Sequence, residues 1–149
     1  MGFETVAVSR SSDKRDLAME LGADHFLDAT GTDPAERLQE LGGARVVLGT
    51  APSASAIEAV AGGLGRDGEL VAVNVPGREV SVDVQGLVGN RASVGGWGSG
   101  HARDSQDAMA FSALRDVTPE VEAYDLADAG EAHERMMANE TRFRAVLEP

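Results

Sequence analysis

The sequence has 149 residues, no cysteine and a net charge of −12, with 25 acidic against 13 basic residues. This length is that of one domain with room for a hydrophobic core, and the negative charge argues against a nucleic-acid partner, whose phosphates it would repel. Without cysteine there are no disulfides or thiolate metal ligands, and no run of 18 apolar residues is present that would cross a membrane.

The amino end shows no charged-then-apolar leader, so we expect a cytoplasmic protein. The surface is acidic and poor in lysine, with Lys14 as the only one. This composition resembles that of proteins from salt-loving organisms, and ordinary acidic solubility is the alternative.

The first clear structural signal lies within residues 4–14. A run of β-branched and small residues over 5–8 predicts a short strand buried on both faces, followed by a helix. Ligands of open α/β sheets bind just outside the carboxyl ends of the strands. Ser9, Arg10 and Lys14 lie there and form a candidate anion site, in which Arg10 offers a planar fork of donors.

The first half of the chain continues as a regular alternation of strands and helices. We expect strands over residues 5–8, 25–27, 46–48 and 69–73, and helices over 13–21, 34–41 and 53–64. This order predicts an α/β fold with a doubly wound parallel sheet and helices on its faces. The crossovers between parallel strands should be right-handed.

The second half is less regular. The pattern predicts a brief extended piece over residues 79–84, a glycine-rich strand over 92–97 and a helix over 104–115. The chain is completed by a strand over 119–124, a helix over 127–138 and a closing strand over 143–147. Ala132, Met136 and Met137 should face inward from this helix.

Six pieces of the sequence, taken in order, resemble the zinc-type medium-chain alcohol dehydrogenase family. They are residues 1–10 (MGFETVAVSR), 18–25 (AMELGADH), 50–53 (TAPS), 73–77 (VNVPG), 95–98 (GGWG) and 142–147 (RFRAVL). The resemblance implies an oxidoreductase that moves a hydride between a nicotinamide cofactor and a small alcohol or aldehyde. In this family zinc polarises the substrate oxygen.

The chain corresponds to only part of such an enzyme. The first strand, the Gly-x-Gly-x-x-Gly turn and the first helix of the cofactor domain would precede Met1. Residues 62–65 (GGLG) follow a helix and precede a strand, which is the wrong side for a pyrophosphate cradle. We therefore expect residues 1–149 to form a partial, Rossmann-like dinucleotide-binding domain with a carboxyl-terminal return segment from about 118 to 149.

No metal site is predicted, because His25, His101 and His133 are widely separated and no cysteine is present. We predict no catalytic residue either, since His101 between small residues in a loop reads as solvated. The family's substrate pocket lies mostly in the part that has no counterpart here.

The resemblance implies a cofactor preference. An acidic residue at the end of the family's second strand binds the ribose of NAD, whereas an arginine accommodates the 2′-phosphate of NADP. Ser9 and Arg10 stand there, so that with Lys14 they predict NADP. The other implied cofactor contacts are Thr50, Ala51, Pro52, Asn74, Val75, Gly96, Trp97, Gly98 and Arg144. Each has an ordinary alternative as a turn, a strand exit, an aromatic plug or a surface charge.

In the family the first strand is central, so without it two neighbouring strands each have an unpaired edge that can pair with another strand. There are three ways in which these edges could be paired. Residues 5–8 pair directly with 46–48, residues 143–147 fill the position of the first strand, or a complementing amino-terminal chain donates a strand. A homodimer through the strand at 92–97 is a further expectation. The leading function is an NADP-preferring alcohol dehydrogenase-like oxidoreductase; the alternatives are a non-catalytic remnant or interaction module and one half of a split enzyme.

Overall fold

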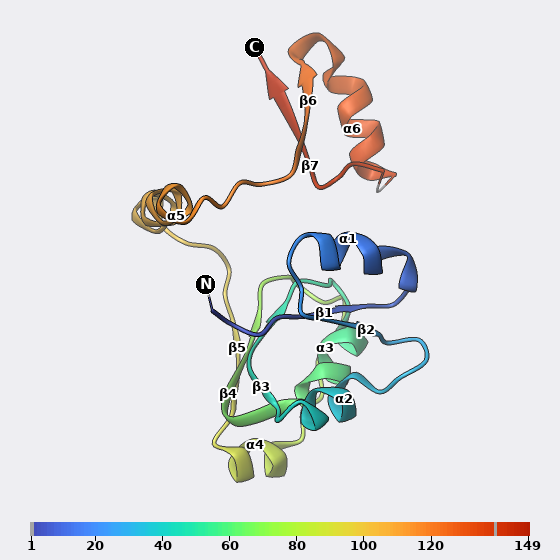
Figure 1. Cartoon of the computed structure of the whole chain (residues 1–149), viewed down its shortest axis with the longest axis vertical. Coiled ribbons are helices and arrows are strands. Elements are labelled where there is room, and N and C mark those ends of the chain that lie inside the picture. The colour runs from blue at the N-terminus through green and yellow to red at the C-terminus, as the bar shows by residue number, and fades with distance from the viewer. Residues whose placement is uncertain (1, 139) are drawn as a thin grey trace. The chain divides into compact units, whose positions relative to one another are not determined.

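A computed structural model describes residues 2–138 and 140–149 (Figure 1). The chain divides into two compact units, Met1–Ser99 and Gly100–Pro149. Each unit is described by itself. The expected return segment from about residue 118 lies within the second unit, whose boundary falls earlier, after Ser99.

The first unit contains five strands, all in parallel pairs. They are β1 (Val6–Ser9), β2 (His25–Asp28), β3 (Ala44–Gly49), β4 (Leu64–Ala72) and β5 (Ser93–Gly96). β1 pairs with β2, and a separate sheet has the order β3-β4-β5. The parallel α/β class predicted from the alternation is confirmed.

Four α-helices and one short 3₁₀ turn connect these strands. They are η1 (Ser12–Lys14), α1 (Arg15–Glu20), α2 (Pro34–Glu40), α3 (Ala54–Ala61) and α4 (Val84–Asn90). Local chemistry sets several starts: the Asp33 carboxylate accepts from the N–H of Ala35 at 2.8 Å ahead of α2, with Pro34 at its first position. Figure 1 shows α1 on one side of β1 and β2, with α2 and α3 on the other.

One hydrophobic core lies between the sheets and α2 and α3. Its buried members are Leu27, Leu38, Ile57, Val60, Leu64 and Leu70. Val6 of β1 and Val47 of β3 both pack against this cluster, and α2 contacts both β2 and β4. The two sheets therefore share one core face and one helix layer, although no hydrogen bond joins them within the described residues.

Two of the three expected ways of pairing the open strand edges are wrong. Residues 5–8 do not pair with 46–48, because β1 hydrogen-bonds only to β2 in the part of the chain described. Residues 143–147 do not fill the gap, because β7 (Arg144–Glu148) belongs to the second unit and pairs there with β6 (Val121–Asp125). The third possibility, that a complementing chain donates a strand, stays a prediction.

The second unit is a helix followed by a parallel strand–helix–strand motif. Its elements are α5 (Ala102–Arg115), β6, η2 (Leu126–Asp128), α6 (Ala129–Met137) and β7. Only Ala132 is buried in α6. The expectation that Ala132 faces inward is confirmed, whereas that for Met136 and Met137 is wrong, because both side chains are exposed.

Two other boundaries differ from expectation. No strand forms over residues 79–84; a loop leads instead into α4, whose first turn is capped by the Asp83 carboxylate at 3.0 Å from the N–H of Gln85. The helix expected over 53–64 ends at Ala61, because two glycines follow and Leu64 opens β4 in the core.

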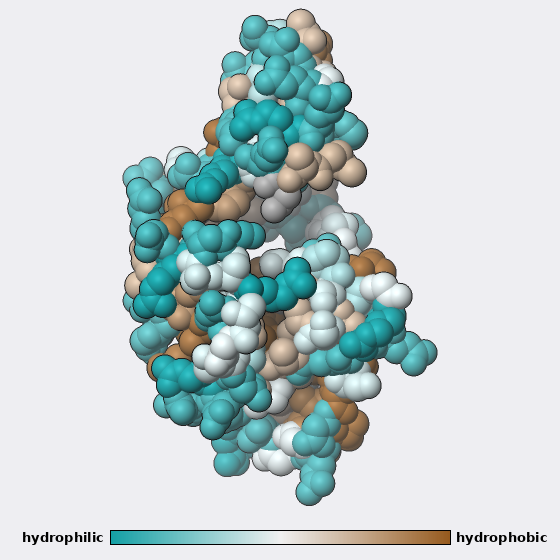
Figure 2. Space-filling model, turned by 90° about the vertical axis from the view of Figure 1, so that its right-hand side faces the viewer, coloured by the Kyte–Doolittle hydropathy of each residue, from teal (hydrophilic) through white to brown (hydrophobic). Residues whose placement is uncertain are grey.

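Hydrophilic and hydrophobic residues are both exposed. Figure 2 shows hydrophilic residues over most of the face in view, with hydrophobic residues in separate patches. No helix in the described residues combines the length and the apolar character needed to cross a membrane.

Candidate cofactor site

The candidate residues of the larger sheet emerge at one edge. In the register of β3, β4 and β5, Gly49 lies beside Ala72, and Ala72 beside Gly96. Thr50, Asn74 and Trp97 follow within one or two residues of these positions. The carboxyl ends of three parallel strands thus deliver the three predicted loops to the edge where ligands of open α/β sheets bind.

Hydrogen bonds join these loops to one another. The Asn74 side-chain amide donates to the carbonyl oxygen of Thr50. The N–H of Trp97 donates to the carbonyl oxygen of Ala72 at 2.9 Å. These bonds hold the first residue after β3, the exit of β4 and the exit of β5 in a fixed mutual arrangement.

Apolar surface and open backbone lie uncovered at this edge. The side chain of Val75 is 89% exposed and that of Trp97 is 61% exposed. A Cβ atom added at Gly96 or Gly98 would meet nothing within 4 Å. The backbone of this segment is therefore accessible to a flat ligand, which could also cover Trp97.

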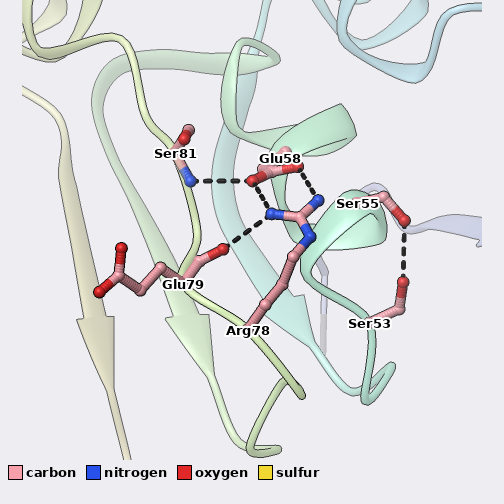
Figure 3. Close-up of polar contacts among 6 residues, drawn as sticks. All are labelled: Ser53, Ser55, Glu58, Arg78, Glu79 and Ser81. Atoms are coloured by element: carbon pink, nitrogen blue, oxygen red, sulfur yellow. Dashed lines mark hydrogen bonds and ion pairs between the residues drawn. The ribbon is translucent and has the colours of Figure 1, made fainter.

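The loop between β3 and α3 contains Ala51 and Pro52 and ends at the N-cap Ser53. The hydroxyls of Ser53 and Ser55 lie 3.0 Å apart and hydrogen-bond to each other (Figure 3). The Ser53 hydroxyl makes no capping bond to the helix backbone. Thr50, Ala51 and Pro52 thus lie in the short connection between β3 and α3.

An ion pair anchors the loop that begins at Asn74. The Arg78 guanidinium donates to both oxygens of the Glu58 carboxylate on α3, at 2.7 Å each, and the N–H of Ser81 donates to it at 2.9 Å (Figure 3). These bonds, led by that of Arg78, lower the pKa of Glu58 to about 2. Sequence reasoning missed this pair, because its members lie 20 residues apart and no local pattern marks them.

Two basic side chains without ion-pair partners among the described residues follow β1, one directly after the strand and one at the end of η1. Ser9 is fixed by its carbonyl oxygen, which accepts from the N–H of Ala29 at 2.8 Å. Arg10 and Lys14 are exposed, and neither forms an ion pair with any residue that the structure describes. Both can therefore meet an external anion, as the candidate anion site requires.

A carboxylate lies at the neighbouring strand end. Asp28 stands opposite Ser9 in the β1–β2 register. Its side chain accepts from the hydroxyl and N–H of Thr30, at 2.6 and 2.9 Å, and these bonds lower its pKa. The hydrogen bonds from Thr30 thus favour the ionised form of Asp28, which places a carboxylate at the strand end next to Ser9.

Two further residues considered from the sequence belong to the second unit. Arg144 opens β7 there. His101 also lies in the second unit, at the N-cap of α5, where its N–H donates to the Asp104 carboxylate at 2.6 Å. This cap gives His101 a structural role.

The donor set does not fit zinc. Zinc sites take Cys, His and carboxylate ligands that converge. His25 hydrogen-bonds to the Glu4 carboxylate at 2.7 Å, and no group of three His, Asp or Glu side chains suited to a metal is found among the described residues. No step of a reaction is assigned to a metal held by these residues.

The glycines before and within β4 serve packing. A Cβ atom at Gly63 would lie 2.6 Å from a methyl carbon of Leu38, and one at Gly43 would lie 2.5 Å from the Cα atom of Gly65. The N–H of Ala44 donates to the carbonyl oxygen of Gly63 at 2.8 Å. This segment lets the end of α2 approach β4 closely, which explains its glycines without a phosphate.

Comparison with known proteins gives consistent results. A family described as zinc-binding dehydrogenase matches residues 1–113. The alcohol dehydrogenase patD of Penicillium expansum is 40% identical over 146 residues, covering 98% of this chain and 43% of that protein. An alcohol dehydrogenase of Geobacillus stearothermophilus is 33% identical over 148 residues, covering 99% of this chain and 44% of its own length.

Solved structures agree in fold. The alcohol dehydrogenase of the hyperthermophilic archaeon Aeropyrum pernix superposes with a TM-score of 0.80 at 28% identity, covering 98% of this chain and 43% of that one. The 149 residues thus span less than half the length of these relatives.

Proposed function

Because the chain belongs to the zinc-binding dehydrogenase family, we propose that it is the cofactor-binding portion of an alcohol dehydrogenase-like oxidoreductase that prefers NADP. The observation that carries the proposal is the convergence of Thr50, Asn74 and Trp97 at the carboxyl edge of three parallel strands. The preference for NADP rests on the two unpaired cations after β1.

The adenosine end of the cofactor would bind near β1. The Ser9 hydroxyl, the Arg10 guanidinium and the Lys14 ammonium would hold the 2′-phosphate by charge-assisted hydrogen bonds. Thr50, Ala51 and Pro52 would border the adenosine. Because these cations stand on a chain of net charge −12, we expect binding of the anion to be local and sensitive to salt.

The nicotinamide end would bind across β4 and β5, and the nicotinamide ring itself carries the hydride. Asn74 and Val75 would border its ribose, and the backbone of Gly96, Trp97 and Gly98 would hydrogen-bond its amide. The resemblance assigns the pyrophosphate to Arg144 of the second unit, and this assignment stays a prediction. Orientation of the ring by these residues is the share of the reaction proposed for this chain.

The chain spans less than half of its relatives, and its donor set does not fit the metal. We therefore propose that the substrate pocket and any zinc ligands belong to residues outside these 149. The cytoplasmic location expected from the sequence stays a prediction. So does a homodimer through residues 92–97; within the described residues, the strand β5 pairs along one edge only.

A titration with NADPH and NADH tests the proposal. Trp97 is the only tryptophan, so quenching of its emission, with energy transfer to the reduced nicotinamide, reports binding at the proposed site. We expect NADPH to bind at least about tenfold more tightly than NADH, which is ~1.4 kcal/mol. Equal affinities would refute the NADP preference, and no binding of either nucleotide would favour the remnant or split-enzyme alternatives for the chain alone.

A further inference from the structure

Three arginines and one aspartate lie together at the amino-terminal edge of the larger sheet. Arg45 is the second residue of β3, Arg66 and Asp67 belong to the irregular first part of β4, and Arg91 comes two residues before β5. We call these four residues the basic cluster. The candidate cofactor residues follow the carboxyl ends of the same strands, so the basic cluster lies at the opposite edge and is separate from them.

The Asp67 carboxylate is the centre of the basic cluster. A terminal guanidinium nitrogen of Arg91 lies 2.6 Å from each of its oxygens, and one of Arg45 lies 3.9 Å from it. Arg45 also donates to the carbonyl oxygen of Arg66 at 3.4 Å. The hydrogen bond from Arg91 lowers the pKa of Asp67, and the charges of Arg45 and Arg66 act in the same direction. Three positive charges thus surround one negative charge.

The backbone holds the basic cluster in a defined arrangement. Asp67 and Arg91 have φ angles of +57° and +51°, in the left-handed region that residues other than glycine rarely adopt. A Cβ atom added at Gly68 would lie 2.7 Å from the carbonyl oxygen of Ala44, so the turn that carries Asp67 packs directly against the start of β3. The ion pair between Asp67 and Arg91 then joins this turn to the residue that ends α4.

Most of the guanidinium donors of the basic cluster are left for an external partner. Each guanidinium carries five N–H donors, and the contacts above use few of them. Arg66 is exposed and forms no ion pair with any residue that the structure describes. The side chains of Arg45 and Arg91 are 70% and 62% exposed. Glu69, the next carboxylate along β4, pairs with none of the three arginines among the described ion pairs.

We propose that the basic cluster binds a phosphate group, free or carried by a small metabolite. The group would accept hydrogen bonds from Arg45, Arg66 and the nitrogens of Arg91 that Asp67 does not occupy. Planar guanidinium forks match the oxygens of a phosphate. The cluster has an excess of two positive charges, which a phosphate dianion balances and a single carboxylate does not.

The charge of the whole chain favours a small ligand over a large one. Its net charge is −12, so an extended polyanion would meet acidic surface beyond the three arginines and be repelled. A phosphate group is compact enough to contact the basic cluster alone. Because neither the cluster nor its ligand involves the candidate cofactor residues, this inference is independent of the proposed function.

A titration of the isotope-labelled chain with inorganic phosphate, followed by amide chemical shifts, tests the inference. At low salt and about pH 8, where a phosphate group is a dianion, we expect saturable shifts at the amides of Arg66, Asp67 and Arg91 in the millimolar range. Sodium chloride at matched ionic strength should not reproduce them. Glycerol 3-phosphate is the second probe: equal affinity indicates that the site binds the phosphate group alone, and tighter binding indicates a carried phosphate.

Substitutions in the basic cluster should act in opposite directions. Arg45→Ala and Arg66→Ala should each weaken phosphate binding at least about fivefold, because each removes charge-assisted donors. Asp67→Asn should strengthen it at least about threefold, since it removes the competing carboxylate and asparagine tolerates the left-handed region.

Arg103→Ala, an exposed arginine on α5 with its own ion pair, is the matched control and should bind phosphate as wild type does. Arg10→Ala should leave the shifts at the basic cluster unchanged, which separates this result from that of the NADPH titration. No saturable shift, the same shifts with chloride, weaker binding by Asp67→Asn, or tighter binding of a glutamate-rich peptide than of phosphate would each overturn the inference.

Discussion

Glu58 and Arg78 form a two-point ion pair, with both terminal guanidinium nitrogens 2.7 Å from the carboxylate oxygens. The pair connects α3 to the loop that leaves β4. The same carboxylate also accepts from the N–H of Ser81 at 2.9 Å, so one side chain fixes two points in the middle and second half of this loop. Exposed single ion pairs contribute little, but this one also satisfies a backbone donor.

The Glu58 carboxylate should make stability depend on pH. Its folded-state pKa of about 2 lies below its ordinary value of 4.5, so its contribution is fully present above about 4.5 and is lost as the pH falls toward 2. Urea unfolding of wild type and Glu58→Gln should show a lower midpoint for the variant at neutral pH and a narrowing difference below about 4.5. Glu79→Gln is the control, because Arg78 contacts its carbonyl oxygen and not its carboxylate.

The tight turn after α2 should depend on a glycine. Gly43 has φ of +83°, and a Cβ atom there would lie 2.5 Å from the Cα atom of Gly65. Gly43→Ala should therefore lower the free energy of unfolding by more than about 1 kcal/mol. Gly31→Ala is the matched control, since a Cβ atom at Gly31 meets nothing within 4 Å and its φ is not in the left-handed region. Equal effects of the two substitutions would contradict the steric account.

Arg10 should decide between the two nicotinamide cofactors. If its guanidinium holds the 2′-phosphate, Arg10→Ala removes a charge-assisted hydrogen bond and weakens NADPH binding by roughly 10-fold or more. NADH lacks this phosphate, so its affinity should change less than about twofold. Arg115→Ala, an exposed arginine at the end of α5, controls for net charge. A parallel loss of both cofactors in the Arg10 variant would refute the role.

The phenol of Tyr124 should lose its proton at a higher pH than an ordinary tyrosine. Its hydroxyl donates to the Glu122 carboxylate at 2.8 Å, and this bond, followed by burial, raises its pKa above the ordinary value of 10. Because Tyr124 is the only tyrosine, the ultraviolet absorbance of its phenolate reports the titration directly. Glu122→Gln should lower the midpoint, since the anionic acceptor is removed, whereas Glu148→Gln at the end of β7 should leave it unchanged.

Much of the fold was predictable from local chemistry. Runs of valine marked β1 and β3 to within about two residues, and Pro34 marked the start of α2. Such runs also marked the carboxyl end of β4, but this strand begins at Leu64, before the expected start at Glu69. α4 was not predicted, because its seven residues include Gly86 and Gly89, which disfavour helix on propensity alone. It forms with Leu87 packed against the core, which is a tertiary contact that local sequence does not encode.

Of the candidate cofactor site, only the positions of its residues directly after strands could be predicted from the sequence. The order of strands and helices places Thr50, Asn74 and Trp97 after successive parallel strands, and the register confirms their common edge. The membership of Arg144 was inferred from resemblance, and it lies in the other unit. The local sequence pattern also could not predict which strands pair with one another, because the partner of an edge strand depends on which elements the core brings together.

The lone ammonium side chain at the end of η1 gives this protein an unusual chemical handle. Lys14 is exposed and is the only lysine among 149 residues, so amine-directed reagents have one side-chain target besides the α-amino group. Lys14 is also one of the three residues proposed to hold the 2′-phosphate. A dye attached to its side chain would therefore mark the proposed 2′-phosphate position, and a bound phosphorylated ligand should slow the attachment.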